Sequence, residues 1–386
     1  MPGNSQIMKP LLAVCAFLLL PAEGRAQAIP RVDVGWGVDT LEAAWTEASW
    51  HAAAVDIFRS WRAYLMADAH LQVPTKYWSI AEQQKWPAYD LTAGVAYKGM
   101  PATVLDIRPV ADSVFVVKTL FSSVSAQERV ARPVALTRVY AVREGGMWVF
   151  SNALVRNTQQ WPHHTVGSFT FVIDPTLRFD RARAVSTVAF ADSVAESLGA
   201  AAPSGVTYIV AQSPEALHDV LGVEWTFGGQ GHGYAIPWNN LILSGDSAFR
   251  EGNRHEVVHH VVATLPKDVR PHPLVNEGIA TWLGGTVGRA FADLRREYAA
   301  YVRDRPDITL DRVLQRGSPD EGLYPAGAIL LEMVYRRAGW SGVNTLLRSG
   351  RSDDELRTAL TRILGLSWSD VEAAWRRRVL NNASAS

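Results

Sequence analysis

The sequence predicts an α+β protein of two domains, the first a helix followed by an antiparallel sheet and the second strands followed by helices. Two observations lead to this prediction. Over 41–69, and again over almost every segment beyond 250, apolar residues recur every three or four positions, which is the period of an amphipathic helix. Between these regions, short apolar runs bounded by turn residues are typical of strands. A chain of 386 residues is long enough for two ordinary domains.

The first 28 residues are predicted to be a cleaved signal peptide. Lys9 precedes a short apolar run at 11–20, and Ala-Gln-Ala at 26–28 supplies small residues for cleavage. An uncleaved anchor is the less favoured alternative, because a membrane span requires about 20 apolar residues. The only cysteine, Cys15, lies in this segment, so we expect a mature chain without a disulfide. These features predict a secreted or periplasmic protein with no stable membrane span.

Residues 30–155 are predicted to form the first domain. Its helix at 41–69 carries Trp50, Phe58 and Trp61 at spacings that bury one face. Strand-like runs follow at 103–110, 113–124, 134–142 and 147–154. A long helix followed by a curved antiparallel sheet resembles the nuclear-transport-factor-2-like fold. That fold hosts many unrelated activities and therefore implies no particular function.

Residues 166–382 are predicted to form the second domain, because the periodicity is lost around 155–167. Helix start and stop signals and alternating apolar runs define its first half, and the chain beyond 250 should be helical. We expect strands at 168–173, 206–211 and 234–243, and helices at 180–198 and from 213.

The charge balance of the chain argues against one class of partner. The 38 lysine and arginine residues equal the 38 aspartate and glutamate residues in number, and no basic block contains interleaved aromatic residues. Binding to nucleic acid is therefore not expected.

A candidate metal site lies at 255–259, which reads His-Glu-Val-Val-His. Residues four apart lie about one turn apart on the same face of a helix, so His255 and His259 can reach one ion. Imidazole nitrogens bind zinc at about 2.0–2.1 Å, which this spacing allows. Glu256 is adjacent, and it can take a proton from a water molecule at the metal without being a ligand. Coincidence on an ordinary helix is the alternative interpretation.

A second element at 276–280, Asn-Glu-Gly-Ile-Ala, argues against coincidence. A catalytic zinc ion needs three protein ligands and one open position, and Glu277 would complete that set from a second helix. Gly278 and Ala280 are small, so we expect this helix to approach the helix of the two histidines closely.

Together, the two elements resemble the gluzincin zinc metallopeptidases, specifically the peptidase MA-like group. The resemblance covers roughly residues 166–380 and is strongest over 250–285. It implies one catalytic Zn²⁺ ion held by His255, His259 and Glu277, and hydrolysis of peptide bonds in a peptide or protein substrate. A zinc-activated water would attack, with Glu256 as the general base.

Two other segments agree with this resemblance, and two depart from it. Tyr324, in Leu-Tyr-Pro-Ala-Gly-Ala, is similar to a family tyrosine that stabilises the oxyanion, although an aromatic residue packed on the core is an equal alternative. The run at 234–243 stands where the family places an edge strand that pairs with substrate. The loop at 228–233 lacks the Gly-x-Met-x-Asn element of aminopeptidases, which weakens an exopeptidase assignment. Thr281 stands where some relatives have a carboxylate that orients a ligand.

Two other functions are compatible with these residues. One is a non-catalytic, secreted, zinc-containing binding protein with a degenerate peptidase domain, and the other is a zinc hydrolase with a non-peptide substrate. His232, His260 and His272 are interpreted as ordinary loop or packing residues rather than ligands. The sequence makes no prediction of side-chain preference or oligomeric state.

Overall fold

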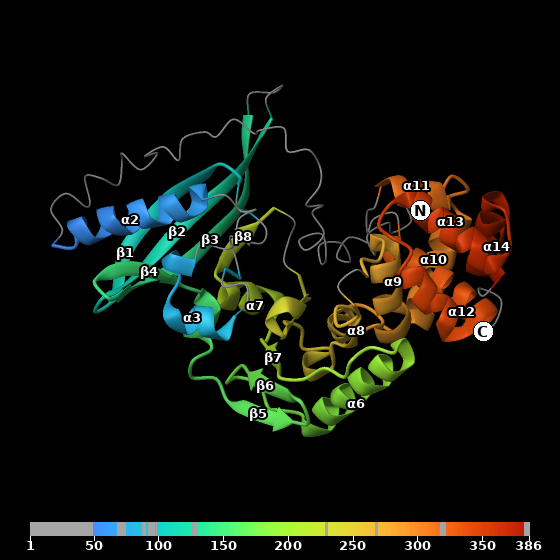
Figure 1. The fold of residues 1–386 in the computed structure, drawn as a ribbon, viewed down its shortest axis with the longest axis horizontal. Coiled ribbons are helices and arrows are strands. Elements are labelled where there is room, and N and C mark those ends of the chain that lie inside the picture. The colour runs from blue at the N-terminus through green and yellow to red at the C-terminus, as the bar shows by residue number, and fades with distance from the viewer. Residues whose placement is uncertain are drawn as a thin grey trace, which may run out of the picture. The chain divides into compact units, whose positions relative to one another are not determined.

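The described residues form one antiparallel and one mixed sheet together with many helices, which confirms the predicted α+β class (Figure 1). The computed structural model describes residues 49–67, 75–86, 90–91, 97, 99–125, 130–227, 231–266, 269–316 and 322–381. The predicted signal peptide at 1–28 lies outside these residues, as does 228–230 of the glycine-rich loop. No helix among the described residues is long and apolar enough to cross a membrane.

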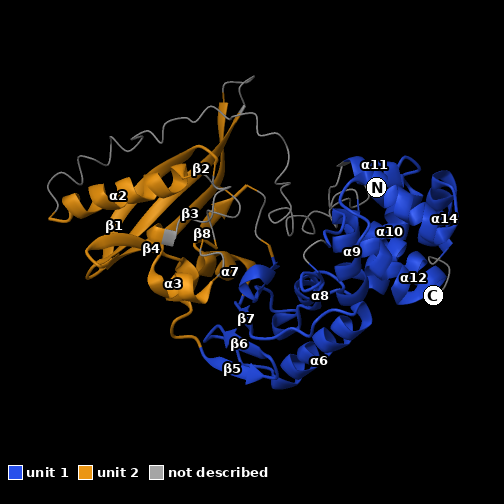
Figure 2. Cartoon of the chain, in the orientation of Figure 1, with its two compact units in different colours: residues 1–13, 162–212, 232–386 blue, residues 14–161, 213–231 orange. Residues whose placement is uncertain are grey.

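The chain divides into two compact units (Figure 2). Among the described residues, unit 2 takes 49–161 and 213–231, and unit 1 takes 162–212 and 232–381.

Unit 2 is built on a five-stranded antiparallel sheet. The strand order is β1-β2-β3-β4, and β8 also pairs with β3. The strands of unit 2 are β1 (Ala102–Ala111), β2 (Val114–Ser125), β3 (Val130–Glu144), β4 (Met147–Ser151) and β8 (Val223–Thr226). Its helices are α2 (His51–Met66), the 3-10 turn η1 (Thr75–Tyr77), α3 (Ile80–Lys85), α5 (Ala153–Asn157) and α7 (Pro214–Leu221). The strand expected at 147–154 thus ends at Ser151, and α5 follows.

Aromatic residues at helical spacing place α2 on one face of this sheet. Trp61 is fully buried, and its indole N–H donates to Thr119 Oγ1 of β2 at 2.8 Å. Its ring meets Phe150 of β4 edge to face, with ring centroids 4.7 Å apart. Burying a large apolar side chain in this way contributes roughly 1.5–3 kcal/mol to stability. Of the helix expected at 41–69, residues 51–66 are helical, and 41–48 and 68–69 lie outside the described residues.

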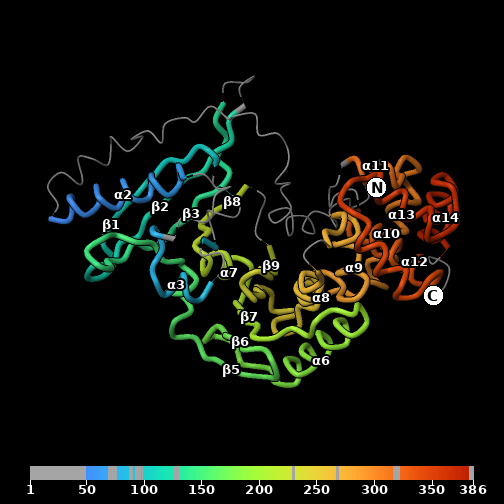
Figure 3. The backbone as a smooth tube through the Cα atoms, in the orientation of Figure 1, coloured from blue at the N-terminus to red at the C-terminus, as the bar shows by residue number. Residues whose placement is uncertain are grey.

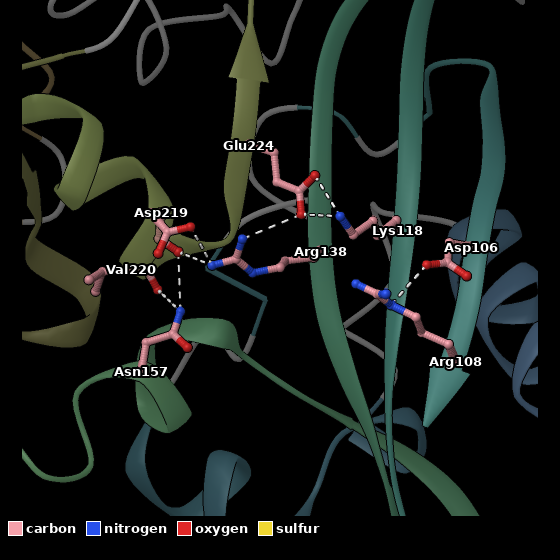
Figure 4. A network of polar contacts seen from close by, with 8 residues as sticks. All are labelled: Asp106, Arg108, Lys118, Arg138, Asn157, Asp219, Val220 and Glu224. Atoms are coloured by element: carbon pink, nitrogen blue, oxygen red, sulfur yellow. Dashed lines mark hydrogen bonds and ion pairs between the residues drawn. The ribbon is translucent and has the colours of Figure 1, made fainter. Parts of the chain in front are cut away.

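The segment 213–231 departs from the expected division of the chain. The sequence places it in the C-terminal domain, but it belongs to unit 2. On β8, Glu224 accepts hydrogen bonds from Lys118 of β2 and Arg138 of β3 (Figure 4). Arg138 also donates to the carbonyl and the carboxylate of Asp219 in α7. The strand β8 is not among the strands that the sequence predicts, and nothing in its local pattern shows that it pairs with β3.

Unit 1 combines a five-stranded mixed sheet with a helical part. The strand order is β5-β6-β7-β10-β9, in which β6, β7 and β10 are parallel neighbours and the two outer strands run antiparallel to theirs. Its strands are β5 (His163–Val166), β6 (Phe169–Ile173), β7 (Val206–Val210), β9 (Gly233–Ile236) and β10 (Leu241–Ser244). Its helices are α6 (Arg181–Leu198), α8 (Arg254–Val262), α9 (Pro273–Gly284), α10 (Phe291–Arg303), α11 (Leu310–Arg316), α12 (Leu323–Leu347), α13 (Asp353–Leu364) and α14 (Trp368–Asn381), with 3-10 turns η2 (Pro237–Asn239) and η3 (Arg250–Gly252).

The single strand expected at 234–243 is a hairpin of β9 and β10. Pro237 begins the 3-10 turn between them, and Asn240 adopts the left-handed conformation, with φ 48°, as the chain reverses. Proline has no amide hydrogen to give to a continuous ladder, which explains the break. As a result β9 is the outer strand of the sheet, and it packs against α8 (Figure 3).

Glycines allow three helices of unit 1 to approach one another closely. A Cβ atom built on Gly278 of α9 would lie 2.5 Å from the carbonyl carbon of Gly327 on α12. A Cβ atom on Gly284 would lie 2.6 Å from the carbonyl carbon of Arg254 on α8. The expected close approach of α9 to the histidine helix is present, but Gly284 makes it, whereas Gly278 faces α12. The sequence shows that a position is small, but not which neighbour it meets.

Gly278→Ala is expected to destabilise the protein by about 1–3 kcal/mol, because the new methyl group would overlap the backbone of Gly327 and force α9 and α12 apart. Urea unfolding of the metal-free protein measures this change. Gly252→Ala is the control, since its added Cβ meets the flexible side chain of Arg183 and, at an ordinary contact distance of 4.0 Å, Thr187 Oγ1, so its cost should be much smaller. Equal stability of the two variants would contradict the helix contact.

Candidate metal centre

Three side chains from two helices of unit 1 converge on one point. His255 and His259 come from α8, and Glu277 comes from α9. The Nε2 atoms of the two histidines are 3.1 Å apart, and each lies 3.3 Å from Glu277 Oε2. Ligands at about 2.0–2.1 Å from a tetrahedral zinc ion are separated from one another by about 3.3 Å. The three atoms therefore have the spacing of ligands that share one metal ion.

The three side chains are largely buried, and they are the one such group among the described residues. His255 and Glu277 are almost fully buried, and His259 is slightly more exposed. Within the described residues, no other set of three His, Cys, Asp or Glu side chains comes together in this way. The structure thus brings together the three ligands that the sequence predicts.

The hydrogen bonding of His255 also favours a cation at this point. Its Nδ1 lies 2.7 Å from the carbonyl oxygen of Gly285, and it must donate, because a carbonyl oxygen only accepts. In the neutral ring, the Nε2 lone pair then points to the same place as the Glu277 carboxylate. These electron-rich atoms repel one another unless a proton or a metal ion lies among them. The tautomer of His255 is thus the one that a metal ligand needs.

The carbonyl group that accepts this hydrogen bond belongs to Gly285, whose backbone conformation favours glycine. Its φ is 75° and its ψ is −161°, and an added Cβ atom would overlap the carbonyl oxygen of Arg289. The sequence pattern does not indicate this residue, and Thr281 stands where some relatives have an orienting carboxylate. The acceptor that orients His255 is the carbonyl of Gly285. The glycine pair that ends α9 was the available signal.

Charges within the site oppose the effect of burial. Burial favours the neutral form of Glu277, but the attraction of His259 and His255 lowers the pKa of Glu277 to about 2. Burial also favours neutral His259, but Glu277 raises the pKa of His259 to about 9. A buried carboxylate therefore stays ionised here, and a proton or a metal ion must balance it.

Glu256 lies on α8 beside the edge strand β9. Its side chain is buried, and burial raises its pKa, while His255 and His259 act in the opposite direction. The backbone of Ala235 also hydrogen-bonds to the Glu256 carboxylate and lowers its pKa. A Cβ atom built on Gly233 would lie only 3.1 Å from Glu256 Cγ, so β9 passes directly beside this carboxylate.

Tyr324 is also close to the ligands. It lies in the first turn of α12, which approaches α9 through Gly327. Its ring centroid is 5.8 Å from that of His255, and the ring is largely buried. The position is compatible with the predicted role in stabilising the oxyanion.

The other histidines stay outside the ligand group, as interpreted from the sequence. His260 is buried, and burial lowers its pKa to about 4. His232 has its Nδ1 2.6 Å from Asp246 Oδ2. His272 begins α9 and caps it.

Comparison with known proteins does not assign the chain to a family. No protein-family model matches the chain, and no curated protein is similar to it in sequence. The gluzincin resemblance therefore depends on the two motifs. The structure itself shows a His-His-Glu group whose atoms lie close enough to bind one metal ion.

Proposed function

We propose that the protein is a zinc-dependent peptidase in which His255, His259 and Glu277 hold the metal and Glu256 is the general base. The observation that best supports this proposal is the set of three candidate ligand atoms at mutual distances of 3.1–3.3 Å, with the buried carboxylate of Glu256 on the same helix as the two histidines. Structural zinc sites usually have four protein ligands, whereas catalytic sites have three and leave one position open. The described residues supply three, which favours a catalytic site.

Each residue of the site has its own role in the proposed hydrolysis. When bound, zinc would polarise the scissile carbonyl and lower the pKa of a water molecule toward neutrality. Glu256 accepts a proton from the attacking water and returns it to the leaving amine. Because burial raises the pKa of Glu256, this carboxyl is closer to the range in which it can both take and give a proton. Tyr324 donates a hydrogen bond to the developing oxyanion.

The edge strand supports a peptide as substrate. Among the described residues, β9 pairs only with β10 and stands at the end of the strand order, and edge strands are where extended peptides add to a sheet. Gly233 and Ala235 of β9 lie against Glu256. A peptide that pairs along this edge would therefore run beside the proposed base.

A peptide-library digest with zinc-loaded protein tests this function. We expect cleavage that chelation abolishes, that added zinc restores, and that a hydroxamate inhibits by occupying the open metal position. Hydroxamate binding without cleavage of any peptide would instead favour a hydrolase with a different substrate. Neither binding nor cleavage would favour the non-catalytic zinc-containing binding protein.

A further inference from the structure

His272 stands at the start of the helix that carries Glu277. It is the N-cap residue of α9, and its Nδ1 accepts a hydrogen bond from the backbone amide of Leu274 at 3.1 Å. Its Nε2 lies 3.0 Å from Asp353 Oδ1, in the first turn of α13. The His272 side chain is buried. One imidazole therefore ties the start of α9 to the start of α13.

These two contacts fix the tautomer of His272. The carboxylate of Asp353 accepts, so Nε2 must donate to it, and the amide of Leu274 donates, so Nδ1 must offer a lone pair. Only the neutral imidazole with its hydrogen on Nε2 satisfies both partners. Protonation of Nδ1 would set two N–H groups face to face and remove the cap.

The surroundings of His272 favour this neutral form at neutral pH. Burial lowers its pKa, Asp353 opposes that effect, and Arg351 adds to it. Asp353 contacts the imidazole from α13, and Arg351, in the segment before that helix, acts on it electrostatically. The unfolded chain, with an ordinary histidine pKa of about 6.5, takes up this proton first as pH falls. The contribution of the cap to stability is therefore complete above about pH 6.5 and decreases as pH falls below it.

The cap acts on a short stretch that leads directly to the metal ligand. The amides of Val275 and Asn276 both donate to the carbonyl oxygen of His272, at 2.9 Å each. Glu277 follows Asn276 on the same helix. Loss of the side-chain cap leaves an amide of the first turn without a partner, and the turn that positions Glu277 becomes less stable.

We propose that His272 is a positioning residue for Glu277, and that its protonation loosens the start of α9 and weakens metal binding below neutral pH. This inference rests on the metal site of the proposed function but not on peptidase activity. Zinc affinity is therefore the readout, and failure to find any peptide substrate would leave the test intact.

Zinc affinity of the full chain, measured by chelator competition from about pH 7.5 to about pH 5, tests the proposal. His272→Asn replaces the imidazole by a good N-cap that does not titrate, and His272→Ala removes the cap. At about pH 7.5, we expect His272→Asn to bind zinc like the wild type and His272→Ala to bind about fivefold more weakly. On acidification, the wild type should lose about three- to fivefold more affinity than His272→Asn, because protonation of the ligands is common to both.

His163→Asn is the matched control, because His163 is an exposed histidine on β5, and it should follow the wild type. Equal acid sensitivity of the wild type and His272→Asn would overturn the proposal, as would unchanged zinc affinity in His272→Ala. Nitrogen NMR of the wild type gives a readout that needs no variant. It should show His272 protonated at Nε2 and not at Nδ1 at neutral pH, and the reverse result would contradict the cap.

Discussion

Glu256→Gln is expected to lower peptide turnover by at least about 10²–10⁴-fold while about one zinc ion per chain remains bound. Glutamine has nearly the shape of glutamate, but it cannot accept the proton of an attacking water. The metal ligands are other side chains, whose donor atoms already lie 3.1–3.3 Å apart. The neutral side chain also suits this buried position, where burial raises the pKa of Glu256. A fluorogenic peptide assay and elemental analysis measure the two quantities.

Two outcomes would change the assignment of Glu256. Full activity in Glu256→Gln would show that another group is the base. Loss of zinc together with activity would show that Glu256 is a ligand. The control is Glu196→Gln on α6, an exposed change that should leave both activity and metal content unaltered.

His259→Ala is expected to lose both zinc and activity. Only two of the three ligands would remain, and we expect zinc affinity to fall more than about a hundredfold, since changes at residues that merely support ligands already cost 10–100-fold. The change also removes the histidine whose attraction helps to keep the buried Glu277 ionised. Zinc content after dialysis, and activity with zinc added back, measure the effect.

The adjacent histidine on the same helix provides a matched control for His259→Ala. His260 is buried like the ligands, but it is not part of their group. His260→Ala should reduce stability through lost packing and still bind about one zinc ion per chain. If His259→Ala keeps its zinc while His260→Ala loses it, the ligand assignment is wrong.

The convergence of the two histidines was predictable because its geometry is local. His255 and His259 share one face of one helix whatever the tertiary fold, and residue spacing alone brings them together. Glu277 lies on a second helix, so its position depended on recognising a motif. The donor and acceptor roles around the site were not predictable. Gly285 and His272 act through contacts with residues far away in the sequence, and nothing in their local pattern names those partners.

In the fold, too, local features were predictable from the sequence and contacts with distant residues were not. The helix α6 begins after its cap Asp180 and ends before Gly199, as expected, because both signals act within a few residues. The hairpin at 234–243 was read as one strand, although Pro237 marked the break. The segment 213–231 is expected in the second domain but groups with unit 2, because strand pairing is decided by distant partners. Alternation of side chains defines strands, and the tertiary fold decides where they pair.

X-ray absorption spectroscopy of the zinc-loaded protein, combined with zinc analysis, shows directly whether His255, His259 and Glu277 form a metal centre. We expect about one zinc ion per chain, with nitrogen and oxygen ligands at about 2.0–2.1 Å, an imidazole signal from two histidines and no sulfur. The same signal should be absent from His259→Ala. Substoichiometric zinc in the wild type, or an unchanged imidazole signal in His259→Ala, would contradict a metal centre formed by His255, His259 and Glu277.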